Sequence, residues 1–171
     1  TSGIGLALDR FPHPRAKRVA TVGLGTGTIA AYAHADDYFC FYEINPNVCV
    51  FATTQFTYLS DATDRGASVA IELGDARISL ERHEPQNYDI IALDAFSGDA
   101  IPAHLLTREA FAEYIRHLAD DGIIAVHISN RHLDLKPVVG GIAEYFDYKL
   151  LLIESDDNGF VGEAGSDWLL L

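Results

Sequence analysis

The chain alternates short apolar runs with segments of helical pattern, and this alternation restricts its possible folds more than any other feature. We expect strands at residues 18–22, 38–43, 68–73, 88–93, 123–128 and 149–153, and a truncated seventh strand at 168–171. We expect helices at residues 2–10, 26–34, 46–54, 76–82, 107–118 and 135–146, with turns at Asp121-Gly122 and at 156–159. Strands that alternate with helices form parallel sheets covered on both faces, so the sequence predicts a doubly wound α/β fold.

The charge balance narrows the classes of partner. The 171 residues include 12 basic and 25 acidic side chains, for a net charge of −13. A nucleic-acid backbone or an anionic membrane surface requires a basic face, so we expect neither as a partner. A small cationic substrate is compatible with this charge. No run reaches the 18 apolar residues of a membrane span, so we expect no insertion of this domain into a membrane.

The cysteines suggest the redox compartment of the protein, and the two ends of the sequence suggest its domain organisation. Cys40 and Cys49 are two cysteines in a chain long enough to have a core, which favours free thiols and a cytoplasmic location, with a disulfide as the alternative. The sequence contains no methionine and stops at an apolar run, 169–171. We therefore expect one domain over residues 1–171, cut from a longer protein.

The glycine-rich segment 22–28, Val-Gly-Leu-Gly-Thr-Gly-Thr, directly follows the first strand. Glycines let the backbone turn sharply and let a ligand approach it, and a following helix would add free N–H groups. A dinucleotide fingerprint has its third glycine three positions after the second, where this chain has Thr28. Gly23, Gly25, Thr26 and Gly27 instead fit an S-adenosylmethionine-type site. A tight strand–helix turn without a ligand is the alternative.

Acidic residues end the next two strands. Glu43 ends the second strand, where a carboxylate can accept both ribose hydroxyls; an exposed strand-end acid is the alternative. Asp75 follows the third strand and can accept from an adenine amino group, while the Ala76 backbone N–H reads the ring. Asp75 can also be the N-cap of the next helix, and the two roles are compatible.

Two further acids, Asp94 and Asp99, lie in the loop after the fourth strand. Carboxylates at this edge of a parallel sheet lie where open α/β folds bind ligands, and they can bind a cationic amine or take its proton. Solvated loop acids are the alternative. His127, Ser129 and Asn130 end the fifth strand and either line the same cleft or serve the core and the caps. The histidines and cysteines lack metal-ligand spacing, so we expect no metal.

Four segments in this order resemble the spermidine synthase family, and particularly its spermidine synthase-like members. They are residues 22–28, 41–46 (Phe-Tyr-Glu-Ile-Asn-Pro), 74–77 (Gly-Asp-Ala-Arg) and 88–102. The resemblance implies the class I methyltransferase sheet of seven strands, the last one antiparallel. It also implies transfer of an aminopropyl group from decarboxylated S-adenosylmethionine to an amine such as putrescine, and it is compatible with a homodimer.

By this resemblance, Glu43 would hold the ribose, Asp75 the adenine and Asp94 the attacking amine. The family has an aspartate in the glycine-rich loop where this chain has Thr26, and its two loop acids are closer together than Asp94 and Asp99. Two alternative functions therefore stay open. One is a methyltransferase that uses intact S-adenosylmethionine, and the other is a nucleoside-binding module without catalysis.

Overall fold

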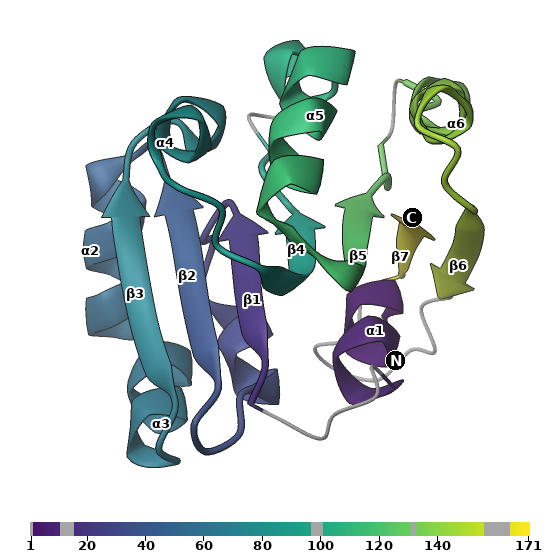
Figure 1. Ribbon diagram of the computed structural model, residues 1–171. Coiled ribbons are helices and arrows are strands. Elements are labelled where there is room, and N and C mark those ends of the chain that lie inside the picture. The colour runs from purple at the N-terminus through teal and green to yellow at the C-terminus, as the bar shows by residue number, and fades with distance from the viewer. Residues whose placement is uncertain (1, 11–15, 97–100, 131–132, 156–164) are drawn as a thin grey trace.

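The computed structural model describes residues 2–10, 16–96, 101–130, 133–155 and 165–171. Seven strands form one sheet in the order β3-β2-β1-β4-β5-β7-β6, in which β7 is antiparallel to both neighbours and the pairs from β3 to β5 are parallel (Figure 1). The strands are β1 (Arg18–Val22), β2 (Tyr38–Glu43), β3 (Ser68–Leu73), β4 (Tyr88–Leu93), β5 (Leu118–His127), β6 (Leu151–Ser155) and β7 (Ser166–Leu170). The predicted doubly wound α/β fold is confirmed.

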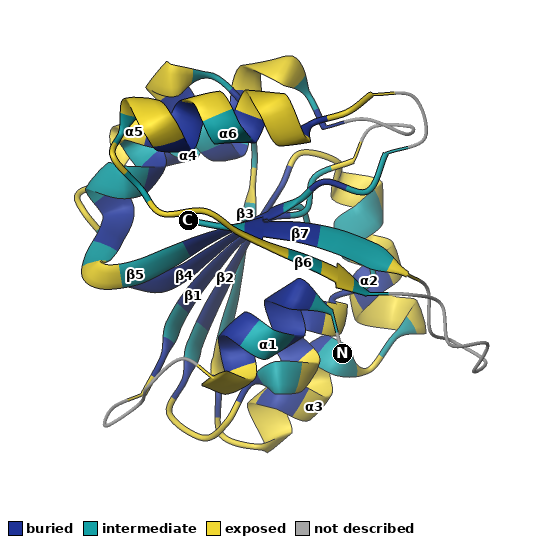
Figure 2. Cartoon of the chain, turned by 90° about the vertical axis from the view of Figure 1, so that its right-hand side faces the viewer, coloured by how far each residue is buried: buried dark blue, intermediate teal, exposed yellow. Residues whose placement is uncertain are grey.

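Helices cover both faces of the sheet (Figure 2). One face carries α4 (Ala76–Arg82), α5 (Arg108–His117) and α6 (Lys136–Tyr145), and the other carries α1 (Gly3–Arg10), α2 (Pro46–Gln55), α3 (Tyr58–Asp64) and the short helix η1 (Thr28–Tyr32). Each face of the sheet has its own hydrophobic core. Along β4, Ile91 and Leu93 pack into the core beneath α4, α5 and α6, while Ile90 and Ala92 pack into the core beneath α1, α2 and α3. This strand is buried on both faces, which is why its sequence is apolar without alternation.

The segment after the glycine-rich loop differs from the prediction. The expected α-helix at 26–34 is the five-residue 3-10 helix η1. Arg65 explains its early end, because its guanidinium donates to the carbonyls of Ala30, Ala31 and Ala33. Without Arg65, these carbonyls would need N–H donors from a longer helix. Because the helix is only one short turn, the dipole that we expected at the loop is small.

Other elements also depart from the prediction. The sequence pattern missed α3 and the 3-10 helix η2 (Ala103–Leu105). The expected turn at Asp121-Gly122 lies inside β5, where the pairing with β4 shifts between Tyr88 and Ile90, so these residues form an irregularity within one strand. Strand β6 begins and ends two residues later than expected. The expected turn at 156–159 lies outside the described residues.

The glycine-rich loop requires glycine for two different reasons. Gly23 has φ +97°, and a Cβ there would lie 2.6 Å from the carbonyl oxygen of Asp94. Gly25 has φ +54°, but a Cβ there would meet no atom within 4 Å. The first glycine therefore lets the ends of β1 and β4 pack together, and the second leaves open space beside the backbone.

The described helices include none that is both long and apolar enough to cross a membrane. Cys40 is buried and Cys49 half-buried, and both are free thiols, as the sequence favoured.

The two glycines provide a matched test of this packing. Gly25→Ala should lower the free energy of unfolding only by the cost of a left-handed backbone at alanine, about 1–2 kcal/mol. Gly23→Ala adds the collision with the Asp94 carbonyl, so we expect its free energy of unfolding to fall by roughly 2–4 kcal/mol. Urea denaturation of both variants measures the difference, and equal losses would contradict the close packing at Gly23.

Buried His117 gives the fold a dependence on pH. Its Nε2 lies 2.9 Å from the Leu80 carbonyl oxygen, and its Nδ1 accepts from the Gln86 N–H. Desolvation by burial is the main cause that lowers the pKa of His117. Below the unfolded pKa of about 6.5, the unfolded chain therefore takes up a proton that the folded chain resists.

We accordingly expect the free energy of unfolding to fall as the pH drops from about 6.5 through the lower pKa of the folded state. His117→Gln should flatten this dependence, whereas His34→Gln, at an exposed position, should keep it. Chemical denaturation between pH 5 and pH 7.5 measures both, and an unchanged slope in His117→Gln would assign the effect to another group.

Candidate functional site

A cavity of about 450 Å³ opens at the carboxyl ends of β1, β2, β3 and β4. Its volume lies in the range of small-molecule sites. Six predicted site residues line it together: Gly23, Gly25, Glu43, Asp75, Ala76 and Asp94. They come from four neighbouring strands whose ends meet at one edge, as the parallel arrangement requires.

Glu43 is buried, with 8% of its surface exposed, so it is not the exposed strand-end acid of the alternative interpretation. Its Oε2 accepts from the Leu24 N–H at 3.1 Å, and its Oε1 accepts from the Asn45 N–H at 2.8 Å. The carboxylate thereby ties the glycine-rich loop to the end of β2. An ionised carboxylate has about four acceptor positions, so about two remain for a ligand.

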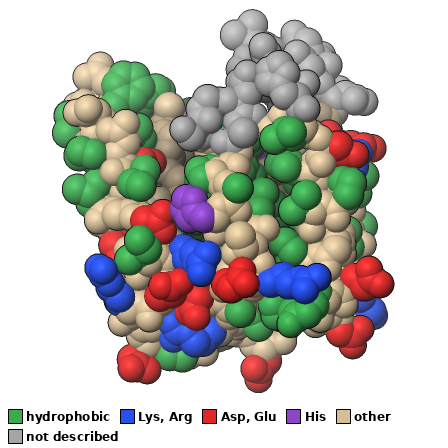
Figure 3. Space-filling model, turned by 90° about the horizontal axis from the view of Figure 1, so that it is seen from above, with side chains coloured by type: hydrophobic (Ala, Val, Ile, Leu, Met, Phe, Trp, Pro, Cys, Tyr) green, Lys and Arg blue, Asp and Glu red, His purple; other side chains and the backbone are tan. Residues whose placement is uncertain are grey.

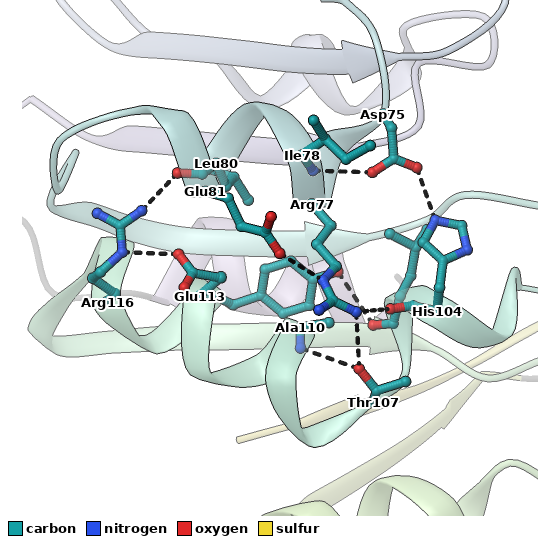
Figure 4. A network of polar contacts seen from close by, with 12 residues as sticks. Asp75, Arg77, Ile78, Leu80, Glu81, His104, Thr107, Ala110, Glu113 and Arg116 are labelled. Carbon is teal, nitrogen blue, oxygen red and sulfur yellow. Dashed lines mark hydrogen bonds and ion pairs between the residues drawn. The ribbon is translucent and has the colours of Figure 1, made fainter.

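Asp75 is the N-cap of α4, because its Oδ1 accepts from the Ile78 N–H at 3.1 Å. Its Oδ2 lies 2.8 Å from Nε2 of His104, which also lines the cavity (Figure 4). Burial by itself would raise the pKa of the Asp75 carboxyl, but the hydrogen bonds from Ile78 and His104 outweigh it and lower this pKa. Asp75 therefore faces the cavity as an anion.

Sequence reasoning missed His104. Arg77 holds its segment against α4, since Nη1 donates to the His104 carbonyl and to Thr107 Oγ1, each at 3.4 Å (Figure 4). The position of His104 in the segment after the fourth strand could have indicated it, because a loop that leaves this edge of the sheet crosses the ligand crevice.

Asp94 follows β4 and has a histidine partner on β5. Its Oδ1 lies 2.7 Å from Nδ1 of His127, and its side chain is one-third exposed (33%). The imidazole stacks on Trp168 with ring centroids 4.6 Å apart and planes 5° apart, and the Phe96 ring meets it edge-on at 4.9 Å. Sequence reasoning named Asp94 and His127 but missed Trp168 and Phe96.

A second cavity, of about 240 Å³, lies on the other side of Asp94. Among the described residues, Asp94 is the one that lines both cavities. The second cavity is lined largely by α1, η1 and β7, with Tyr32, His127 and Trp168 on its wall. The two cavities therefore adjoin at Asp94.

The remaining predicted residues lie elsewhere. Thr26 and Gly27 do not line the described wall of the larger cavity, and Asp99 lies outside the described residues. Ser129 Oγ accepts from the Asp167 N–H of β7, and Asn130 Oδ1 accepts from the Leu133 N–H, so both side chains bond to backbone N–H groups.

The electrostatic character of the site comes from its acids. Its described lining contains three carboxylates, those of Glu43, Asp75 and Asp94, and no Lys or Arg. Seen from above the carboxyl edge, Lys and Arg side chains lie next to Asp and Glu side chains rather than forming one basic patch (Figure 3). Across the described residues, no group of three or more His, Cys, Asp or Glu is arranged to hold a metal ion.

One relative by sequence is a polyamine aminopropyltransferase from Vibrio vulnificus, which is 32% identical over 120 residues. The match covers 67% of this chain and 38% of that protein, so the chain spans well under half the length of this relative. No protein-family model matches the chain.

Solved structures share the fold. A spermidine synthase in complex with the transition-state analogue AdoDATO has a TM-score of 0.71 at 16% identity, and the match covers 99% of this chain and 57% of that one. Human methyltransferase-like protein 13 in complex with SAH has a TM-score of 0.69 at 20% identity, over 97% of this chain and 74% of that one. The chain therefore has a spermidine synthase-like fold, with class I methyltransferases among its structural neighbours.

Proposed function

We propose that this chain is the catalytic domain of a transferase that moves an aminopropyl group from decarboxylated S-adenosylmethionine to a small amine such as putrescine. The observation that carries the proposal is the position of Asp94, between a cavity that suits a nucleoside and a second cavity. The relatives support the reaction class, since one is a polyamine aminopropyltransferase and one solved structure holds AdoDATO.

The larger cavity fits the nucleoside part of such a donor. The open space beside Gly25 accommodates a ligand that approaches the backbone closely. Glu43 has acceptor positions left for the two ribose hydroxyls, and Asp75 can accept from an adenine amino group. Ile44 and Val48 add apolar surface to the same wall, which suits an aromatic base.

Asp94 would act on the amine. An alkyl amine has a pKa near 10 and is mostly protonated at pH 7, so it must lose a proton before its nitrogen can attack. The carboxylate accepts that proton and orients the amine. The nitrogen then forms a bond to the methylene carbon beside the sulfonium, the C–S electron pair goes to sulfur, and methylthioadenosine leaves.

Methyl transfer from intact S-adenosylmethionine is the second candidate. Thr26 favours it, because the spermidine synthase family has at this position an aspartate that would repel the carboxylate of the intact donor. The methyltransferase structure with bound SAH supports the same alternative. In that reaction Asp94 would face the acceptor of a methyl group.

The nucleoside assignment predicts a loss of affinity in two variants. Glu43→Gln and Asp75→Asn each remove a charged acceptor. Asp75→Asn keeps an amide oxygen for the Ile78 N–H, whereas Glu43→Gln keeps an oxygen for one of its two backbone partners, Leu24 or Asn45. We expect each to raise the Kd of methylthioadenosine about 5- to 150-fold, the effect of one lost hydrogen bond. Glu72→Gln, on β3 but outside the cavity lining, is the control. Calorimetric titration measures all three, and wild-type affinity in both site variants would refute the assignment.

The role of Asp94 predicts a loss of turnover. Asp94→Asn keeps the shape and an oxygen for His127 but removes the proton acceptor. We expect turnover with decarboxylated donor and putrescine to fall by about 10²–10⁴, with little change in donor affinity. The assay uses the complete natural protein, with intact S-adenosylmethionine tested in parallel. Full aminopropyl transfer by Asp94→Asn would exclude the base role, and methyl transfer without aminopropyl transfer would place the second candidate first.

A further inference from the structure

The Asp94–His127 pair lies on strand ends whose register brings the two side chains together. Leu93, the last residue of β4, pairs with Val126 of β5. The residues that follow them, Asp94 and His127, therefore lie side by side. His127 in turn pairs with Trp168 across the antiparallel contact between β5 and β7. The imidazole therefore lies between the carboxylate of one neighbouring strand and the indole of the other.

The ring is held on several sides. Trp168 stacks on it and is itself 3% exposed, and Phe96 contacts it edge-on. Helix α1 packs closely against Trp168, since a Cβ on Gly3 would lie 2.5 Å from the Trp168 Cβ, and the indole Nε1–H donates to Ser166 Oγ at 3.3 Å. Packing thus fixes the plane of the imidazole, and within that plane Nδ1 points to Asp94.

The contacts also determine where the ring carries its proton. An ionised carboxylate only accepts hydrogen bonds, so the 2.7 Å contact requires the proton on Nδ1. Nε2 is buried and has no hydrogen-bond partner among the described residues. His127 also lines the second cavity, but its Nε2 is not exposed there, so among the described residues the polar contact that links this ring to the site is the one from Nδ1 to Asp94.

We propose that His127 is a positioning residue, whose Nδ1–H holds Oδ1 of Asp94 so that the other carboxylate oxygen faces the junction of the two cavities. This inference rests on the proposed function, in which that oxygen accepts the proton of the amine. A single carboxylate at the end of a strand can rotate about its side-chain bonds. Fixing one oxygen keeps the other within reach of the amine at the moment of attack.

Two variants separate the hydrogen bond from the ring packing. His127→Phe keeps an aromatic ring against Trp168 and Phe96 but has no donor. His127→Asn loses the ring but can place an amide N–H near the position of Nδ1. We expect turnover to fall about 10- to 100-fold in His127→Phe, with methylthioadenosine affinity unchanged, and to recover in large part in His127→Asn.

A purely structural role gives the opposite order. His127→Phe would then keep its turnover, and His127→Asn would lose turnover and thermal stability together. Either that order or wild-type turnover in both variants overturns the proposal. His34→Asn, at an exposed position, is the control for replacing a histidine.

A second measurement does not depend on activity. Nitrogen NMR of ¹⁵N-histidine-labelled protein should show His127 protonated on Nδ1 in the wild type. In Asp94→Leu, which has no acceptor, the proton should move to Nε2. A wild-type ring protonated on Nε2 would overturn the inference. Wild-type protein that binds both donors but turns over neither would instead refute the proposed function, and the NMR result would still decide whether His127 holds Asp94.

Discussion

The site depends on backbone hydrogen bonds that continue the parallel pairing beyond the ends of the strands. The Gly23 N–H donates to the Tyr42 carbonyl, the Asp94 N–H to the Val22 carbonyl and the Gly74 N–H to the Glu43 carbonyl. These bonds keep the first residues of three loops in register with the sheet. Loop residues are normally the mobile part of a fold, but here the candidate site residues lie where the sheet still fixes the backbone.

Glu43 extends this order into the glycine-rich loop. Its Oε2 accepts from the Leu24 N–H and so holds the loop at its start, ahead of the five-residue helix η1. Because Glu43 has a structural role beside its proposed binding role, truncation to alanine would be ambiguous, and an amide replacement that keeps the length of the side chain is more informative. The same reasoning applies to Asp75, which caps α4 while it faces the cavity.

The first four strands could be predicted to the residue because each is an apolar run closed by a turn residue or an acid. The parallel arrangement then placed Glu43, Asp75 and Asp94 at one edge from sequence alone. The length of η1 could not be predicted, since it depends on Arg65, more than 30 residues away. The partnership of Asp94 with His127 depends on the irregularity in β5, which sets the register of His127 against β4. His104 was missed for a related reason, because its position comes from Arg77 and not from its own segment.

The carboxylates of the larger cavity are paired in large part with backbone N–H groups and histidines, and its described lining has no Lys or Arg to neutralise them. The cavity therefore keeps a negative potential, which raises the rate at which cations enter it. In the proposed reaction the donor arrives as a positively charged sulfonium, whereas methylthioadenosine is a neutral thioether. The transfer thus removes the charge that the cavity attracts, and the nucleoside is held less strongly after the reaction than before it, which favours release of the product over its retention as an inhibitor.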